Sequence, residues 1–214
     1  MARRGERLLV AVALLLSAAL SPAAEPDFGV ERPSNDARYA AEFVLATADH
    51  RQRPFAIVDK REARVYVFDA AGHLTGTSSV LLGLAPGDTA IADIAQRRPA
   101  SLAPHERSTP SGRFETQPGH NDKGEAIVWV DYAAALAIHR LRPAPAHQRR
   151  PERLASATPD DKRISLGCIV VPVAFYEAVV EPLLGRQRGV VYVLPETRPV
   201  QALFGTEPLQ FAGR

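Results

Sequence analysis

The stretch RISLGCIVVP, residues 163–172, is the segment around which we interpret the rest of the chain. It holds the only cysteine of the sequence, Cys168, directly after Gly167, and Ser165 lies three residues before the cysteine. Three β-branched residues follow and end at Pro172. β-Branched residues favour strands, and proline favours the first position of a helix. The pattern therefore predicts a tight turn that presents a thiol at the mouth of a strand, with a helix opening at the proline.

A second apolar segment, ALAIH at residues 135–139, ends in His139. A lone cysteine in an exported enzyme, paired through space with a histidine distant in sequence, is a candidate nucleophile with its base. The alternative is that Cys168 is a small buried hydrophobic residue, which is what a single cysteine most often is. Composition alone leaves both interpretations open.

The N-terminus indicates export. Arg3, Arg4 and Arg7 precede an apolar run at residues 8–20, which is too short to span a bilayer comfortably, and small residues follow at positions 21–24. This is the pattern of a secretory signal peptide, so we expect residues 1–24 to be removed and the protein to be periplasmic or cell-wall associated. An uncleaved N-terminal anchor is the alternative. No later stretch is apolar enough to cross a membrane, so no integral membrane segment is expected after cleavage.

The remaining chain has no net charge. Removing residues 1–24 takes away three arginines and one glutamate and leaves 23 basic and 23 acidic residues. Nucleic acid is therefore not an expected partner. About 190 residues are enough for one domain with its own core. A single cysteine allows no internal disulfide, and an unpaired thiol in an oxidising compartment must be buried or used.

The hydrophobic pattern predicts one mainly β domain at residues 55–195. Before it we expect a linker and an N-terminal helix in residues 25–54, with Ser34 or Asn35 as N-cap, and after it a C-terminal tail in residues 196–214. Three strands at residues 55–59, 64–69 and 74–82, separated by turn signals, predict an antiparallel meander. Further strands are expected at residues 114–116, 125–130, 135–139 and 189–194.

Two short helices and one long loop complete the prediction. One helix is expected at residues 88–94, capped by Asp88, and another after Pro172, ended by Pro182 and Gly185. Residues 140–163 are rich in proline and arginine and lack strand alternation. Loops of this length in compact domains are usually functional or disordered. We interpret this one as a flap over the site, with a surface insertion as an equal alternative.

Four segments, in this order, resemble the YkuD-type L,D-transpeptidase catalytic domain. They are VDK and RVYVF within residues 58–68, STPSGRF at 108–114, AIH at 137–139 and SLGCI at 165–169. The resemblance covers residues 55–195 and implies a mainly β, sandwich-like or meander fold with a short helix after the catalytic cysteine. It also implies an exported cell-wall enzyme that uses cysteine on peptidoglycan stem peptides, with no metal or organic cofactor.

The resemblance gives each site residue a role. Cys168 would attack the carbonyl before the terminal D-residue of a tetrapeptide and form a thioester, with His139 as the base. Backbone N–H groups at Gly167 and Cys168 would form the oxyanion hole, and Ser165 would orient the turn or be purely structural. The acceptor, which decides the product, can be another stem peptide, a protein lysine or water.

The sequence departs from the family pattern at three positions. Leu166 stands where the family usually has histidine, Val170 where it usually has arginine or asparagine, and Arg140 where it commonly has glycine. Arg140 or Arg163 is a speculative contact for a substrate carboxylate. The alternatives are a catalytically silent peptidoglycan-binding domain, in which Cys168 is packed, and an L,D-carboxypeptidase or thiol hydrolase on the same scaffold. A zinc site is weaker, because no further Cys or His lies at ligand spacing.

Overall fold

The computed structural model describes residues 26–98 and 101–205. The signal peptide predicted at residues 1–24 lies outside the described residues, as does the end of the predicted tail at 206–214. Within the described ranges, no helix combines the length and apolar character needed to cross a membrane.

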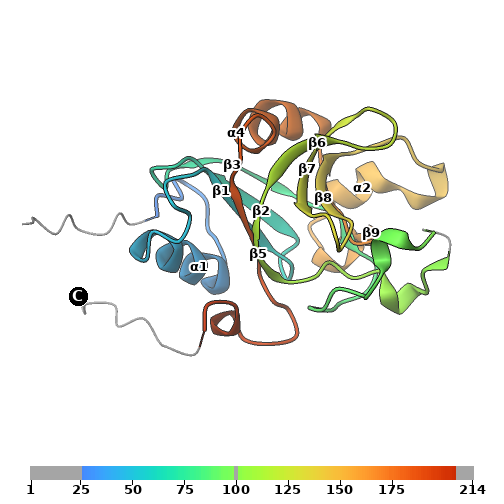
Figure 1. The fold of residues 1–214 in the computed structure, drawn as a ribbon, viewed down its shortest axis with the longest axis horizontal. Helices are drawn as coiled ribbons and strands as arrows, with labels where there is room; N and C mark the ends of the chain where they lie inside the picture. The colour runs from blue at the N-terminus through green and yellow to red at the C-terminus, as the bar shows by residue number, and fades with distance from the viewer. Residues whose placement is uncertain (1–25, 99–100, 206–214) are drawn as a thin grey trace, which may run out of the picture.

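Most of the structure is built from two sheets (Figure 1). The five-stranded sheet has the order β3-β2-β1-β11-β5 and consists of β1 (Phe55–Asp59), β2 (Arg64–Phe68), β3 (Leu74–Ser79), β5 (Gly112–Glu115) and β11 (Val190–Val193). The four-stranded sheet has the order β10-β8-β7-β6 and consists of β6 (Gln117–His120), β7 (Ala126–Asp131), β8 (Leu136–Arg140) and β10 (Ile169–Val171). A short parallel pair joins β4 (Leu82–Gly83) to β9 (Arg163–Ser165).

The helices are short apart from the first. They are α1 (Asn35–Ala46), α2 (Arg150–Ala155) and a continuous segment made of α3 (Val173–Phe175), a π-helical turn (Tyr176–Val180) and α4 (Glu181–Leu184). Single 3₁₀ turns lie at Ile94–Gln96, Pro104–Glu106, Ala146–Gln148, Pro159–Lys162 and Val200–Leu203. In Figure 1, α1 and α2 lie on opposite sides of the sheets.

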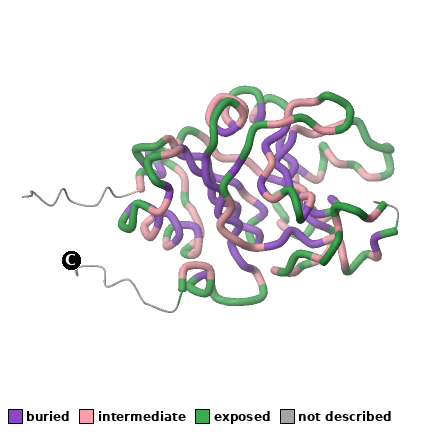
Figure 2. The backbone as a smooth tube through the Cα atoms, viewed as in Figure 1, coloured by how far each residue is buried: buried purple, intermediate pink, exposed green. Residues whose placement is uncertain are grey.

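The main core lies between the two sheets, where alternate residues of each strand point inward. It combines residues of the five-stranded sheet, the four-stranded sheet and the α3–α4 segment, represented by Val58, Val67, Val193, Val128, Ile138, Ile169 and Tyr176. Figure 2 shows this burial as purple backbone concentrated in the strands. His139 therefore lies on a strand anchored in the core, and Cys168 directly precedes another such strand, β10.

A second core covers the other face of the five-stranded sheet. There Phe55 stacks on Phe68, with 4.7 Å between ring centroids, and both pack in the cluster that includes Val44 of α1. The hydroxyl of Ser34 accepts a hydrogen bond of 3.0 Å from the N–H of Ala37, which confirms Ser34 as the N-cap of α1. The molecule thus has three layers, with α1 outside and the two sheets stacked beside it.

The expected fold class is confirmed: the chain is mainly β, with an N-terminal helix and a short helix after Cys168. The antiparallel meander β1-β2-β3 is confirmed as well. Two parallel pairings were not expected. They join β1 to β11 and β8 to β10.

Two helix predictions are wrong in detail. No helix forms at residues 88–94, because Asp88 uses its carboxylate on Lys60 and on the N–H groups of Glu196 and Thr197. Pro182 does not end its helix. It lies inside the continuous helical segment, directly after the π-helical turn at Tyr176–Val180, and Gly185 is the C-cap.

Candidate active site

Ser165 and Gly167 shape the turn that presents Cys168. The Ser165 hydroxyl donates to the carbonyl of Cys168 at 2.7 Å and accepts from the N–H of Gly167 at 3.1 Å. Gly167 has φ +140°, and a Cβ there would come within 2.9 Å of the Ser108 carbonyl oxygen. A side chain at this position would therefore be strained and crowded, which explains why glycine precedes the cysteine.

Thr109 ties a second segment to this turn. Its buried hydroxyl donates to the carbonyl of Gly167 at 2.7 Å and accepts from the N–H of Gly83 at 2.9 Å. No role for Thr109 was predicted from the sequence, although it lies in the STPSGRF segment that carries the family resemblance. One hydroxyl thus links β4, the loop before β5 and the cysteine turn.

Four charged groups lie beneath this loop. The buried Lys60 ammonium donates to the carbonyls of Gly87 and Thr109 at 2.5 and 2.7 Å and pairs with Asp88 at 2.8 Å. Glu196 lies 3.3 Å from the same ammonium and also pairs with Arg163. Burial alone would raise the pKa of Asp88, but the hydrogen bonds from Lys60 and Thr197 lower it well below its usual range. These ion pairs hold the loop that carries Thr109.

His139 lies on β8, and its ring is buried. Its Nδ1 lies 2.8 Å from the carbonyl oxygen of Arg140. A carbonyl can only accept, so Nδ1 carries the hydrogen and Nε2 keeps the lone pair. Burial, reinforced by the charges of Arg142 and Arg150, lowers the pKa of His139 to about 4. The imidazole is therefore neutral at pH 7 with an unprotonated Nε2, although His139 itself is not among the residues that line the cavity at Cys168.

The strand register places Cys168 and His139 on neighbouring segments of the backbone. His139 is the partner of Val170 across β8 and β10, and Cys168 lies two residues before Val170. Strand spacing and rise put the two Cα atoms about 8 Å apart. Within the described residues, no hydrogen bond joins the thiol to the imidazole. Instead, the Cys168 Sγ donates to the carbonyl of Ala135 at 3.4 Å.

The thiol of Cys168 is protonated in this arrangement. Burial raises its pKa, outweighing the hydrogen bond from the backbone of Ala137 and the charge of Arg142, which lower it. A thiol that donates to a carbonyl must also carry its proton. The resting pair is therefore neutral thiol and neutral imidazole, and not an ion pair of thiolate and imidazolium.

A cavity of about 450 Å³ opens at Cys168. Cys168, Gly167 and Leu166 line one side of it, and Trp129 and Tyr132 line another. The facing wall comes from a segment between β4 and β5 and consists of Ala90, Ile91, Ile94, Ala95, Arg97 and Leu102. His120 and Asp122 complete the polar part of the lining. The cavity has the size of a small-molecule or peptide site.

Of the two alternatives for residues 140–163, the structure favours a surface insertion over a flap on this cavity. No residue of the loop at 140–163 lines the cavity at Cys168. That loop packs through Leu154 against Leu81 and Val170 on the outside of β10. The loop is therefore a structured insertion, because the contacts of Leu154 with Leu81 and Val170 hold it against β10.

The two speculative arginines lie away from the cavity. Arg140 pairs with Glu177 at 3.2 Å and lies over the ring of Tyr176. Arg163 pairs with Glu196 and donates to the carbonyl of Lys60 at 3.0 Å. Neither lines the cavity at Cys168, so neither is placed to hold a substrate carboxylate there.

The expected oxyanion hole also needs correction. The N–H of Gly167 already donates to the hydroxyl of Ser165 at 3.1 Å, which leaves the N–H of Cys168 as the remaining candidate of the two. Leu166 is 39% exposed and lines the cavity, whereas Val170 is buried. Leu166, the first departure from the family pattern, thus changes the cavity wall, whereas Val170 changes only the packing.

Within the ranges that the structure describes, no group of three or more His, Cys, Asp or Glu side chains is arranged to hold a metal ion.

No protein-family model matches this sequence, and a search of curated proteins gave no match. The chain is similar to solved L,D-transpeptidase structures. One is the catalytic domain from E. faecium L,D-transpeptidase, with TM-score 0.37 and 17% identity over 67% of this chain and 98% of that chain. Another is the L,D-transpeptidase (residues 123–326) from Xylanimonas cellulosilytica, with TM-score 0.39 and 16% identity over 66% of this chain and 60% of that chain.

A third is the Ldtfm-avibactam carbamoyl enzyme, with TM-score 0.39 and 17% identity over 67% of this chain. The aligned part spans about half of that structure, 49% of its length.

Proposed function

We propose that this protein is a cysteine-dependent acyltransferase of the L,D-transpeptidase type, exported and acting on peptidoglycan stem peptides through a thioester. One observation carries the proposal: Cys168 lines an open cavity, while the adjacent strand holds His139 as a neutral base whose free nitrogen is Nε2. The motif resemblance at residues 165–169 and 137–139 supports the same assignment.

In the first half-reaction, the Cys168 thiol gives its proton to Nε2 of His139 as sulfur attacks the peptide carbonyl. The N–H of Cys168 faces the oxygen that becomes negative. The C–N bond then breaks, and His139 returns the proton to the departing amine of the terminal D-residue. The product is a thioester on Cys168.

In the second half-reaction, an acceptor amine loses a proton to His139 and attacks the thioester. The C–S bond breaks and the proton passes to sulfur, which restores the thiol. Because the resting pair is neutral, proton transfer has to accompany attack, so the rate depends on how substrate aligns Nε2 with sulfur.

The first experiment measures thioester formation. Purified protein is incubated with a tetrapeptide stem, and intact-mass spectrometry follows an acyl adduct on Cys168 and release of the D-amino acid. Cys168→Ala should give no adduct, and His139→Gln should slow its formation by about 10²-fold or more. Normal adduct formation with His139→Gln would contradict the assigned base.

Hydrolysis on the same scaffold is the second candidate, because water can reach an open cavity. Product analysis separates the two: peptide dimers indicate transfer, and tripeptide without dimers indicates an L,D-carboxypeptidase. If Cys168 forms no adduct and resists small electrophiles in the folded protein, the silent peptidoglycan-binding domain becomes the better assignment.

A further inference from the structure

The insertion at 140–163 contains a cavity of its own. It has a volume of about 390 Å³ and lies between residues 141–146 and 149–152. Three arginines line it, Arg142, Arg149 and Arg150, together with one acidic residue, Glu152. Its first lining residue, Leu141, directly follows the strand that carries His139.

The arginines are only partly compensated. The Nε of Arg142 lies 2.8 Å from the Glu125 carboxylate. Arg150 bonds through its Nε to a neutral partner, the Gln148 amide oxygen at 2.7 Å. For the side chain of Arg149, the described part of the chain offers no ion pair or hydrogen bond. Burial and then the nearby charge of Arg142 lower the pKa of Arg150, so positive charge is concentrated here without enough anions.

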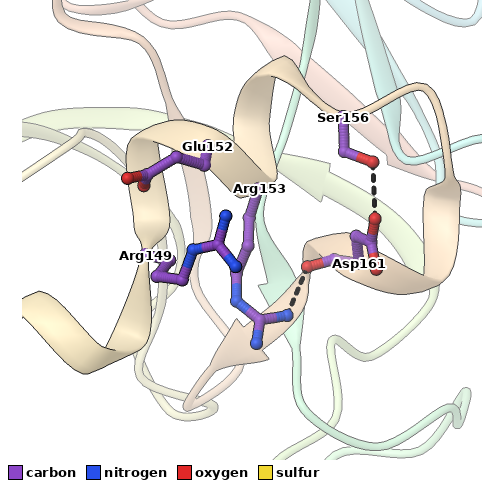
Figure 3. Close-up of a pocket in the computed structure, with 5 residues that line it drawn as sticks. All are labelled: Arg149, Glu152, Arg153, Ser156 and Asp161. Atoms are coloured by element: carbon purple, nitrogen blue, oxygen red, sulfur yellow. Dashed lines mark hydrogen bonds between the residues drawn. The ribbon is translucent and has the colours of Figure 1, made fainter.

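The neighbouring cavity behind α2 makes a useful contrast (Figure 3). It is about 320 Å³ in volume and shares Arg149 and Glu152 with the first cavity, and its other three lining residues bond to one another. Arg153 donates to the Asp161 carbonyl at 2.7 Å, and Ser156 donates to the Asp161 carboxylate at 2.6 Å. In Figure 3 the carboxylate of Glu152 is directed away from the guanidinium groups of Arg149 and Arg153. Glu152 therefore does not neutralise the arginines of the first cavity.

We propose that the cavity lined by Arg142, Arg149 and Arg150 is a binding site for a phosphate group. Guanidinium groups bond oxyanions through fixed pairs of N–H donors. One carboxylate has two oxygens and is satisfied by one guanidinium, whereas a phosphate presents enough oxygens for several. Three arginines around one cavity fit a phosphate better than a carboxylate.

Two sources of phosphate are compatible with the lining. Pro143, Ala144, Pro145 and Pro151 give the cavity an apolar wall. An apolar body attached to the phosphate would gain from burial against this wall, whereas free inorganic phosphate would use only the arginines. Both ligands present a phosphate group to the arginines, and only one of them also carries an apolar body.

The test is a binding titration at constant ionic strength, with inorganic phosphate, phenyl phosphate and acetate followed by calorimetry and by the arginine Nε–H signals in NMR. Saturable phosphate binding that weakens about tenfold in Arg149→Gln and in Arg150→Gln, equivalent to about 1.4 kcal/mol, is the expected result. Tighter binding of phenyl phosphate identifies a phosphate ester as the ligand, and equal binding identifies the free ion.

Arg188→Gln is the matched control, because Arg188 is exposed and lies outside this cavity. Arg149 is exposed and its side chain supports no other group, so its replacement should leave the thermal midpoint unchanged. Binding that is not saturable, that is equal in all variants, or that is as tight for acetate would overturn the proposal. The titration is repeated with Cys168→Ala, so the result does not depend on whether the proposed enzyme activity is correct.

Discussion

Ser165 stabilises the cysteine turn through two hydrogen bonds made by one hydroxyl. Replacing it with alanine removes both and leaves the buried N–H of Gly167 without this acceptor. We expect Ser165→Ala to lower the free energy of unfolding by about 1–3 kcal/mol, measured by urea denaturation. Ser78→Ala is the control, because Ser78 bonds only to the carbonyl of the next residue. Equal effects of the two substitutions would contradict the role given to Ser165.

His139 makes stability depend on pH. Its pKa falls from 6.5 to about 4 on folding, so the unfolded chain binds more protons between these values and stability falls as the pH drops through this window. A shift of this size corresponds to about 3 kcal/mol at pH 4. Urea denaturation at pH 7 and pH 4 should show that His139→Gln loses less stability than the wild-type protein. An identical loss in both proteins would show that the burial of this ring is not responsible.

At this scale the sequence predicted Cys168, His139 and the turn residues Ser165 and Gly167, because rare residue types and glycine leave a local signal. It did not reveal Thr109, whose partners are Gly83 and Gly167, far away in the chain. It also placed Arg163 wrongly, since the nearby carboxylate of Glu196 is invisible in a local pattern.

Thr109 connects secondary-structure elements, so its replacement should weaken the contacts between them. Thr109→Val keeps the side-chain shape but leaves the N–H of Gly83 and the carbonyl of Gly167 without this partner. We expect the free energy of unfolding to fall by about 1–3 kcal/mol and hydrogen exchange at Gly83 to accelerate. Thr75→Val, at an exposed position of β3, is the control and should change neither the free energy of unfolding nor the exchange rate at Gly83. Unchanged exchange at Gly83 in Thr109→Val would contradict the link.

The strands β1 and β2 were predicted almost to the residue, because their apolar and β-branched runs mark a strand without knowledge of its partner. The wall facing Cys168 was not predicted. Its residues lie in the described ranges 90–98 and 101–102, which contain no strand and no α-helix, so no period marks them. For residues 140–163 the sequence left a flap and a surface insertion as equal alternatives, because the proline and arginine content hides the buried Leu154 that anchors the loop.

Over the whole molecule, the buried ion pairs around Lys60 join the meander, the loop at Asp88 and the segment after β11. Removing the ammonium leaves two buried carboxylates with less positive charge. We expect Lys60→Met to destabilise the protein by about 3–5 kcal/mol, measured by urea denaturation. Lys123→Met, at an exposed turn, should cost less than about 0.5 kcal/mol. A small effect of Lys60→Met would show that the network contributes little to stability.

The position of β11 has a consequence for biosynthesis. This strand lies between β1 and β5, so the middle of the larger sheet stays open until residue 193 has been translated. A nascent chain that has left the ribosome only as far as β10 already carries the thiol and the imidazole, yet lacks the strand that completes their scaffold. Co-translational folding of this domain should therefore stall until β11 has left the ribosome, and the emerging polypeptide should remain sensitive to protease up to that point.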